Sequence, residues 1–301
     1  MSENKLDLIK GSISLESDMA EKKSSVSDSV NSYMGDAIQN DSDINTIDSQ
    51  DKPEVSVLIG FPECGKTSFV ASLYHIAIST GMIGKWQCYD SDTFVGFERR
   101  LFLRRYNTNY ASSGTLRTIR GDAHILTLKL INNEVEKCIL LSDHSGEDYA
   151  DYANHPRKIA SDALLQHCDR IIILVDSCVL ISRKNLSMKN QFENLLTGMK
   201  NAGVLNKKKE LLIIFNKRDV ISESETEIYS QRKTEFTDLL MNTCGIKANK
   251  IFDIQANNVE DRNLNDCISH ISESVKSVSE YNKAELNRLN WVNKILNRES
   301  L

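Results

Sequence analysis

The chain has 301 residues, of which 40% are hydrophobic and 26% charged, and its formal net charge is −5. With three prolines and thirteen glycines, the composition excludes collagen-like and proline-rich classes and suits one large domain with additional segments, or two small domains. No apolar run approaches the ~20 residues that a membrane-spanning helix needs. The first ten residues lack the hydrophobic core of a signal peptide, so we expect a cytoplasmic protein without a stable membrane span.

The seven cysteines include no C-x-x-C pair, and several fall in predicted strands or helices. Closely spaced cysteine pairs are the usual signature of zinc sites and of redox motifs. The observed pattern instead favours reduced thiols in the core of a cytosolic protein, with neither a disulfide framework nor a zinc site.

The acidity of the chain is concentrated at its start. Residues 1–54 carry twelve acidic and five basic side chains, a net charge of −7, so residues 55–301 carry about +2. Residues 1–53 are also rich in Ser, Asp and Asn, which predicts a disordered acidic tail, although short apolar stretches such as residues 30–38 would also suit folding onto a partner. The absence of a basic stripe argues against nucleic acid as a partner.

Residues 55–70 have the pattern of a buried strand, a glycine turn and a helix over residues 65–80, with the spacing G-x-x-x-x-G-K-[ST]. Glycines let the backbone approach phosphate oxygens, and successive N–H groups at a helix N-terminus form an anion cradle. We expect Lys66 to reach the β- and γ-phosphates and the Thr67 hydroxyl to bind Mg²⁺. The residues predicted to surround the phosphates are Gly60, Pro62, Glu63, Cys64, Gly65, Lys66, Thr67 and Ser68. Glu63 is a departure, because a carboxylate beside phosphates is unfavourable unless it points outward.

The segment of residues 85–121 is longer than a minimal nucleotide-switch loop requires. Residues 90–106 have helical periodicity within it, so we predict a helical insertion. Two strands are expected next, over residues 123–131 and 135–142. The Asn-Asn pair between them suits a hairpin turn, so this pair is predicted to be antiparallel.

The second of these strands ends in Asp143, and Gly146 follows three residues later. Asp143 would hold the Mg²⁺ shell through water, and the Gly146 N–H would meet the γ-phosphate, where only glycine allows a close approach. On its own, D-x-x-G is explained equally well by a turn at a strand end. Its position after a phosphate loop favours the functional interpretation.

The rest of the chain alternates strands and helices, as α/β proteins do. Residues 170–177 and 210–215 are continuous apolar runs, typical of strands buried in a parallel sheet. The remaining predicted elements are helices over 157–168, 187–201 and 223–243, a short strand over 251–254 and a long helical pattern over 264–296. The end of that last pattern, residues 281–301, is predicted to extend past the domain, either as further core or as a helix that docks in a partner's groove.

The strand of residues 210–215 is followed by Asn216, Lys217 and Asp219. Guanine presents two donors on one edge, and the Asp219 carboxylate can accept both, whereas adenine lacks one of them. The Lys217 stem can lie across the base, and Asn216 can tie this loop to the phosphate loop. A charged turn after a strand is the alternative. Ala256 lies where its backbone N–H could contact the guanine oxygen.

Together, the motifs GFPECGKT, DHSGE and NKRD resemble those of a Ras-type GTPase domain of the TRAFAC class, over about residues 54–280. More narrowly, FPECGKTSFVASLY, DTFVGFERRLFLRRY followed by TLRT, and DHSGEDY resemble the bacterial double-GTPase family of prophage and conflict loci. The resemblance implies a P-loop NTPase fold: a three-layer α/β sandwich with a mostly parallel six-stranded sheet, one antiparallel edge strand and helices on both faces. Any second GTPase domain would have to come from another chain.

The resemblance also implies roles for single residues. In that family the insertion ends in an Arg-Thr pair, so Thr118 matches the first-switch threonine that completes Mg²⁺ coordination, with Thr115 as the alternative. Arg117 would be an internal arginine finger or an exposed switch residue. Glu147 occupies the place of a water-orienting glutamine, with His144 as a minor rival. Ala256 matches the alanine of the last base-contacting motif, but Gln255 replaces the usual Ser before it.

The function that follows is slow, Mg²⁺-dependent hydrolysis of GTP to GDP by a molecular switch, with a bacterial defence or conflict system as its implied context. The catalytic residues would be Glu147, Lys66 and Arg117. The alternatives are a GTP-sensing module with negligible hydrolysis and a phosphotransferase or ATPase that uses the same loop, and NKRD argues against the latter. We expect protein partners to bind through the switch regions, the acidic tail or the C-terminal helix, and these partners would include another GTPase-domain chain.

Overall fold

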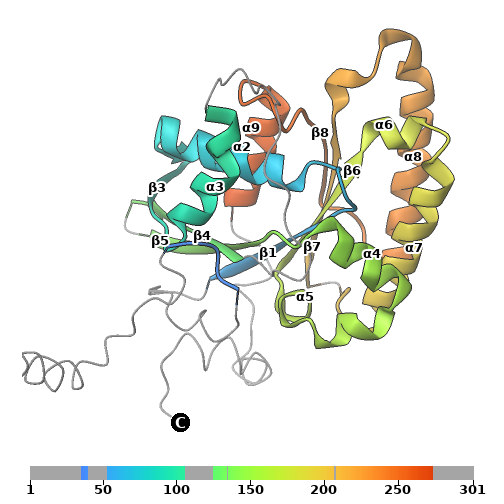
Figure 1. The fold of residues 1–301 in the computed structure, drawn as a ribbon, viewed down its shortest axis with the longest axis horizontal. Helices are drawn as coiled ribbons and strands as arrows, with labels where there is room; N and C mark the ends of the chain where they lie inside the picture. The colour runs from blue at the N-terminus through green and yellow to red at the C-terminus, as the bar shows by residue number, and fades with distance from the viewer. Residues whose placement is uncertain (1–34, 40–52, 106–124, 134, 207, 274–301) are drawn as a thin grey trace, which may run out of the picture. The chain divides into compact units, whose positions relative to one another are not determined.

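The computed structural model describes residues 35–39, 53–105, 125–133, 135–206 and 208–273 (Figure 1). All of them belong to the unit Tyr33–Leu301, and the other unit, Met1–Ser32, contains none. Most of the predicted tail, the predicted extension over residues 281–301, and Thr115, Arg117 and Thr118 lie outside the described residues. The domain limits at residues 54 and 280 therefore stay predictions.

An eight-stranded sheet with the strand order β2-β3-β4-β5-β1-β6-β7-β8 forms the centre of the described structure. Strands β5, β1, β6, β7 and β8 run parallel, and β4, β3 and β2 extend one side through antiparallel pairings. The strands are β1 (Glu54–Ile59), β2 (Met82–Ile83), β3 (Trp86–Asp90), β4 (Ile125–Asn132), β5 (Val135–Ser142), β6 (Arg170–Asp176), β7 (Glu210–Asn216) and β8 (Lys250–Asp253).

All six predicted strands are present, but the predicted strand number and the single antiparallel edge strand are wrong. The two additional strands, β2 and β3, form an antiparallel pair within the segment assigned to the end of a helix and to the insertion. Gly84, at a φ of 57°, makes the turn between them, and only Ile83 and Trp86 of the two strands are buried. Such short, half-exposed strands leave no apolar run in the sequence.

The β4–β5 hairpin forms as predicted. Its antiparallel pairing runs from Ile125 opposite Ser142 to Asn132 opposite Val135. Asn133 lies in the turn at a φ of 51°, a left-handed conformation that asparagine adopts more readily than most residues.

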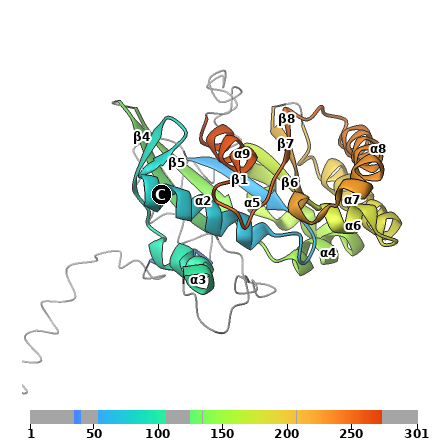
Figure 2. The ribbon, with the colours of Figure 1, turned by 90° about the horizontal axis from the view of Figure 1, so that it is seen from above.

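Helices cover both faces of the sheet, so the predicted three-layer arrangement is confirmed (Figures 1 and 2). One face carries α2 (Lys66–Thr80), α3 (Phe94–Arg105) and α9 (Arg262–Ser272). The other face carries α4 (Gly146–Asn154), α5 (Ala163–His167), α6 (Ser177–Ile181), α7 (Asn185–Asn201) and α8 (Thr226–Cys244). Three short 3₁₀ turns connect elements of the chain: η2 (Pro156–Ser161), η3 (Arg218–Val220) and η4 (Glu223–Glu225). Within the described part of the chain, none of the helices combines the length and hydropathy required to cross a bilayer.

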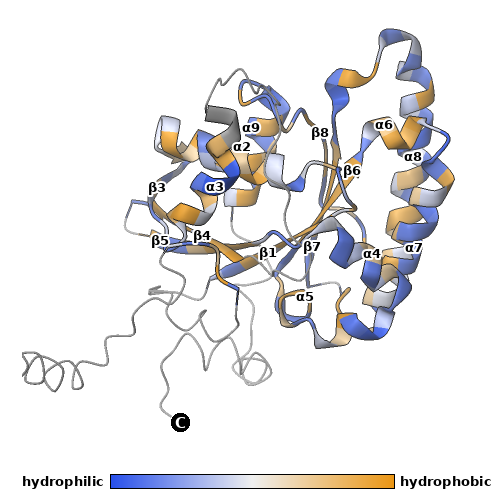
Figure 3. Cartoon of the chain, viewed as in Figure 1, coloured by the Kyte–Doolittle hydropathy of each residue, from blue (hydrophilic) through white to orange (hydrophobic). Residues whose placement is uncertain are grey.

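The two helical layers enclose separate buried clusters on opposite faces of the sheet. Successive side chains of a strand point to opposite faces, and accordingly Ile171 and Ile173 of β6 pack with α4, α7 and α8, whereas Ile172 and Leu174 pack with α2 and α9. Figure 3 shows hydrophobic colouring along the central strands and hydrophilic residues over much of α7 and α8. This two-sided core makes the strand ends rigid supports for loops.

The described residues 35–39 of the predicted tail contact the sheet and α3. Ile38 forms an antiparallel bridge with Ile125 at the start of β4, with both N–O distances at 3.0 Å. The Gly35 carbonyl accepts hydrogen bonds from the N–H groups of Val95 and Gly96, at 2.8 and 3.2 Å. Because Ile38 is fully buried, the described end of the apolar stretch noted in the sequence, residues 35–38, folds onto its own chain.

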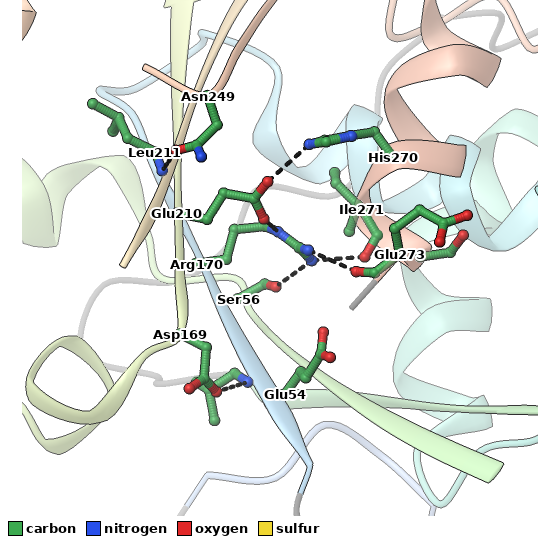
Figure 4. A network of polar contacts seen from close by, with 12 residues as sticks. Glu54, Ser56, Asp169, Arg170, Glu210, Leu211, Asn249, His270, Ile271 and Glu273 are labelled. Atoms are coloured by element: carbon green, nitrogen blue, oxygen red, sulfur yellow. Dashed lines mark hydrogen bonds and ion pairs between the residues drawn. The ribbon is translucent and has the colours of Figure 1, made fainter. Parts of the chain in front are cut away.

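A buried arginine ties α9 to the amino-terminal ends of the parallel strands (Figure 4). Arg170 Nε lies 2.5 Å from Glu210 Oε2, and the same guanidinium donates to the carbonyls of Ile271 at 2.6 Å and Glu273 at 2.8 Å. His270 Nε2 lies 2.9 Å from Glu210 Oε1. Since the last carbonyls of a helix lack partners within it, this network satisfies them and anchors the end of α9.

Candidate functional site

The loops that carry the three sequence motifs meet at the carboxyl ends of the parallel strands. Strand β1 lies between β5 and β6, and β7 follows β6, with all these strands pointing in one direction. The loop after β1 holds Lys66, the loop after β5 begins at Asp143, and the loop after β7 holds Asp219. The carboxyl ends of strands in open α/β sheets are the usual location of ligand sites.

The loop after β1 curls tightly around the Lys66 amine. Lys66 is buried, and its Nζ donates a hydrogen bond to the Gly60 carbonyl at 2.7 Å. A Cβ added at Gly60 would lie 2.5 Å from Cys64 Sγ and 3.0 Å from the Leu174 carbonyl oxygen, so only glycine fits at this turn. Thr67 and Ser68 follow at the start of α2, both half-buried.

Glu63 takes a left-handed conformation at the exposed tip of this loop. Its φ is 66°, a region that costs a residue with a Cβ about 1–2 kcal/mol. Both Glu63 and its neighbour Pro62 are exposed. The exposure of Glu63 meets the condition under which its carboxylate would avoid bound phosphates.

Cys64 has a structural role in the same loop. Burial raises the pKa of its thiol, although the nearby Lys66 charge acts in the opposite direction. The thiol is therefore protonated at neutral pH, which makes it a poor nucleophile. A cavity of about 300 Å³ lies between this loop and α7, lined by Phe61, Met188 and Phe192 among others. The lining also includes Pro62, Glu63 and Cys64 of the predicted phosphate loop but none of Lys66, Thr67, Asp143 and Asp219, so the cavity borders that loop on its α7 side.

Asn216 links the loop after β1 to the loop after β8. Its Nδ2 donates to the Cys64 carbonyl, and its Oδ1 accepts from the Ala256 N–H, each at 2.9 Å. A Cβ at Gly65, whose φ is +98°, would lie only 2.1 Å from Asn216 Nδ2. The predicted tie is thus formed. The Ala256 N–H is already engaged, so a contact between this group and a base would compete with its bond to Asn216.

The side chains predicted to bind the base border open space. Lys217 is half-buried, with a φ of 63°, and its Nζ lies 2.7 Å from Asp176 Oδ2. Asp176 also caps the N-terminus of α6 through its Oδ1. Asp219 is exposed, which leaves its carboxylate accessible to a ligand.

Asp143 is fully buried and pairs with a residue that the sequence interpretation missed. Arg100 Nε, from α3, donates to Asp143 Oδ2 at 2.7 Å. Among the described residues, Asp143 Oδ1 is buried and has no hydrogen-bond partner. Oxygen atoms are the ligands that Mg²⁺ prefers, so the chemistry of this unpartnered carboxylate oxygen suits a hydrated Mg²⁺. Nothing in the local sequence separates Arg100 from Arg99, which is exposed and pairs with Asp36 at 2.5 Å.

Gly146 opens α4 and packs directly on the phosphate loop. A Cβ at Gly146 would lie 2.3 Å from the Pro62 nitrogen, so no larger residue allows this approach. Ser145 caps the helix through a reciprocal capping box with Asp148. Glu147 lies in the first turn of α4 and is half-buried.

His144 is turned into the protein interior. Its Nδ1 lies 2.6 Å from Ser142 Oγ, its Nε2 lies 3.6 Å from Asp162 Oδ2, and the residue is buried. Because both ring nitrogens face neighbouring side chains, His144 is unsuited to the water contact considered as a minor alternative. The other predicted catalytic and switch residues, Arg117 and Thr118, lie outside the described residues.

Comparison with solved structures finds matches of low similarity. The translation elongation factor SelB from Methanococcus maripaludis, in complex with the GTP analogue GppNHp, is 15% identical with a TM-score of 0.41, and the match covers 78% of this chain and 36% of that one. The Methanosarcina barkeri Roco2 RocCORdC bound to GDP is 14% identical with a TM-score of 0.37, over 80% and 56% of the two chains. A bacterial selenocysteine-specific elongation factor, EF-Sec, is 14% identical with a TM-score of 0.40, and the match covers 76% of this chain and 29% of that one.

These values are too low to carry an argument about this chain, which spans less than two thirds of the length of each of these proteins. No curated protein matches the sequence. In contrast, a family model described as Double-GTPase 2 matches residues 55–276, well over half of the chain and all three motif loops. The resemblance predicted from the motifs is confirmed, and the chain belongs to the Double-GTPase 2 family.

Proposed function

We propose that the chain binds a Mg²⁺–guanine nucleotide at the carboxyl edge of its sheet and hydrolyses GTP slowly to GDP as a molecular switch. The observation that carries this proposal is the junction of three motif loops: Asn216 bonds the phosphate loop, and Gly146 packs against it. Membership of a GTPase family supports nucleotide binding.

The phosphates would be held by Lys66 and by the backbone N–H groups of the loop from Gly60 to Thr67. Lys66 is poised for this role, because its amine is buried inside the loop and bonded to a carbonyl that a phosphate oxygen would replace as its partner. Thr67, Asp143 and Thr118 would hold Mg²⁺. When bound, Mg²⁺ would supply positive charge that offsets the negative charge developing in phosphoryl transfer.

Glu147 is our candidate for orienting the attacking water, since it lies next to Gly146 on the first turn of α4. A carboxylate in this place repels the γ-phosphate, and for this reason we propose a low intrinsic rate. Arg117 would supply the positive charge that stabilises the transition state.

Guanine selectivity would come from Asp219, whose exposed carboxylate can accept from both donors of the base, with the Lys217 stem across its face. The pairing rejects adenine because a mismatch leaves polar groups without partners.

The alternative is a GTP-sensing module with negligible hydrolysis. It is favoured by the direct packing of Gly146 on Pro62, which links the start of α4 to the loop that would contact the γ-phosphate. A change at that phosphate would then move α4 whether or not the bond is cleaved.

Single-turnover hydrolysis of GTP separates the two proposals. With GTP fully bound, we expect the wild type to form GDP faster than Lys66→Ala, and Glu147→Gln to be slower than the wild type. Equal rates for wild type and Lys66→Ala at full occupancy would leave only the sensing module. A normal rate in Glu147→Gln would show that the carboxylate is dispensable.

Partners and cellular context rest on the sequence. We propose that protein partners, including another GTPase-domain chain, bind through the switch regions, the acidic tail or the C-terminal helix, and that the protein acts in the cytoplasm in a bacterial defence or conflict system. Size-exclusion chromatography with GDP and with a nonhydrolysable GTP analogue tests whether that second GTPase-domain chain is another copy of this chain. A mass that does not depend on the nucleotide would contradict self-association through the switch regions.

A further inference from the structure

We propose that Arg100 is the resident countercharge of Asp143 and opposes Mg²⁺ binding at this carboxylate, so that the position of α3 sets how firmly the Mg²⁺–nucleotide complex is held. The inference rests on the proposed function, because it concerns the same Mg²⁺ site. It gives the helical insertion a regulatory task.

The contact between the two side chains is buried and specific. Arg100 Nε lies 2.7 Å from Asp143 Oδ2, and the side chains are 10% and 0% exposed. A second nitrogen of the same guanidinium, Nη1, donates to the Gly96 carbonyl one turn earlier in α3 at 2.8 Å. The arginine is therefore held by its own helix while it reaches across to the end of β5.

The charges explain why this contact opposes the metal. A buried carboxylate is costly unless a positive charge accompanies it, and Arg100 supplies that charge without Mg²⁺. A carboxylate that is already neutralised attracts a second cation less strongly, and the guanidinium itself repels Mg²⁺ at short range. The bond to Oδ2 leaves Oδ1 available, so Arg100 weakens the site without blocking it.

Helix α3 is in turn held by the N-terminal segment of residues 35–39. The Gly35 carbonyl accepts from the N–H groups of Val95 and Gly96, and Asp36 pairs with Arg99. These contacts lie within one or two turns of Arg100 on the same helix. A partner that displaced this segment would thus loosen the helix that delivers Arg100, and the protein would retain Mg²⁺–nucleotide longer.

The test measures how much Mg²⁺ is needed to slow the release of a fluorescent GDP analogue from the full chain. We expect Arg100→Gln to lower the half-maximal Mg²⁺ concentration by about tenfold, because a repulsive charge is removed from a site of low effective dielectric constant. Arg100→Lys, which keeps the charge, is expected to stay near the wild-type value. A purely structural role for Arg100 predicts no change, and a role in orienting Asp143 toward the metal predicts a higher Mg²⁺ requirement; either result overturns the proposal.

Lys137→Met is the matched control. Lys137 and Glu54 form another buried ion pair, at 3.1 Å, and both lie toward the opposite ends of their strands from the site. Its loss removes a buried charge partner in the same way, yet the Mg²⁺ requirement is expected to be unchanged. An equal shift in Lys137→Met and Arg100→Gln would assign the effect to general destabilisation and overturn the proposal.

A second comparison applies if Arg100→Gln does not fold. Asp143→Asn and Asp143→Asn/Arg100→Gln are then compared, because the double variant leaves no buried charge without a partner. The double variant is expected to need less Mg²⁺ than Asp143→Asn, and an equal or greater need overturns the proposal. If folded wild type binds no GDP analogue with or without Mg²⁺, the proposed function fails too; if it binds and only the variants' Mg²⁺ dependence is unchanged, Arg100 alone is dismissed.

Discussion

The side-chain amide of Asn216 holds together two loops that are far apart in the chain, through one bond to Cys64, 152 positions away, and one to Ala256. The residue is buried, so neither backbone group would find water if the amide were lost. At the scale of single residues, Asn216 is therefore as important to the shape of the site as Lys66 is to its charge.

Asn216→Ala is expected to lower the free energy of unfolding by about 1–3 kcal/mol for each backbone group left without a partner. It should also weaken GDP binding, because the phosphate loop loses its tie. Chemical denaturation and calorimetry measure the two effects. The matched control is Asn249→Ala, which removes a similar bond to the Leu211 N–H, at 2.9 Å, from the opposite end of β7. It should affect stability alone; weakened GDP binding in Asn249→Ala would contradict this account.

Asp219→Asn is expected to change the base preference of the site from guanine to xanthine. The amide can donate to the carbonyl that replaces the exocyclic amine in xanthine, while guanine loses its bidentate acceptor. Competition between GTP, XTP and ATP for a fluorescent nucleotide gives the preference, which should shift by about a hundredfold or more. Glu223→Gln, a change of a nearby exposed carboxylate, should leave the preference for GTP intact. Unaltered selectivity in Asp219→Asn would place base recognition elsewhere.

The motif residues of the site could be predicted from the sequence, but the role of Arg100 could not. Spacing fixes Lys66, Asp143 and Asn216 because the chemistry of phosphate, metal and base limits which residues can follow each strand. Arg100 belongs to a helix with several arginines, and its contact with Asp143 depends on how α3 rotates and docks, which periodicity does not specify.

Some helices and strands can be predicted from the sequence more easily than others. Six strands were predicted from their apolar runs, whereas the two-residue β2 and the partly exposed β3 leave no such run in the sequence. Helix α4 was missed because its sequence, GEDYADYAN, is largely polar and follows the D-x-x-G motif without a break. The capping box of Ser145 and Asp148 was the signal that would have identified its start.

Ile38→Asp tests the docking of residues 35–39. A charge at this fully buried position should detach the segment, and amide hydrogen exchange at Ile125 and Val95 should then rise by about tenfold or more, because their bonds to the segment open. Val135→Asp, at a site that is 59% exposed, is the control and should leave both amides protected. Unchanged exchange in Ile38→Asp would show that these bonds do not form in solution.

The network that anchors α9 should make stability depend on acid. Burial by itself would raise the pKa of the Glu210 carboxyl, but the hydrogen bond from His270 and the Arg170 guanidinium outweigh it and lower the pKa below its ordinary value. The folded state therefore holds this proton less tightly than the unfolded chain does. The resulting stabilisation is fully present above the ordinary pKa and is lost as pH falls through the lowered one.

Glu210→Gln should lower the free energy of unfolding by about 3–5 kcal/mol at neutral pH, because Arg170 is left buried without its anion. The variant should then lose less further stability than the wild type between about pH 6 and about pH 3. Denaturant unfolding across this range gives both quantities. Parallel acid curves for the two proteins would contradict the assignment, and Glu260→Gln, at an exposed residue, should follow the wild type.

At the scale of the described structure, stability and binding lie at opposite ends of one sheet. The Arg170 network holds the amino-terminal ends of the parallel strands, and the motif loops lie at their carboxyl ends. The two-sided core between them fixes where each loop begins. Substitutions at the Arg170 end should therefore change the unfolding free energy with little effect on nucleotide affinity, whereas substitutions in the motif loops should change nucleotide affinity.

Calorimetric titration of the folded chain with GDP, GTP and ATP in the presence of Mg²⁺ tests the central claim most directly. We expect GDP and GTP to bind with dissociation constants of about 1 μM or lower. ATP should bind with a dissociation constant that is higher than that of GTP by about a hundredfold or more. Lys66→Ala should weaken the binding of both GDP and GTP without preventing saturation at higher nucleotide concentration, because the variant loses only the cation that would contact the phosphates. Well-folded protein that binds neither GDP nor GTP, or that binds ATP as tightly as GTP, would contradict the claim that these loops form a guanine-nucleotide site.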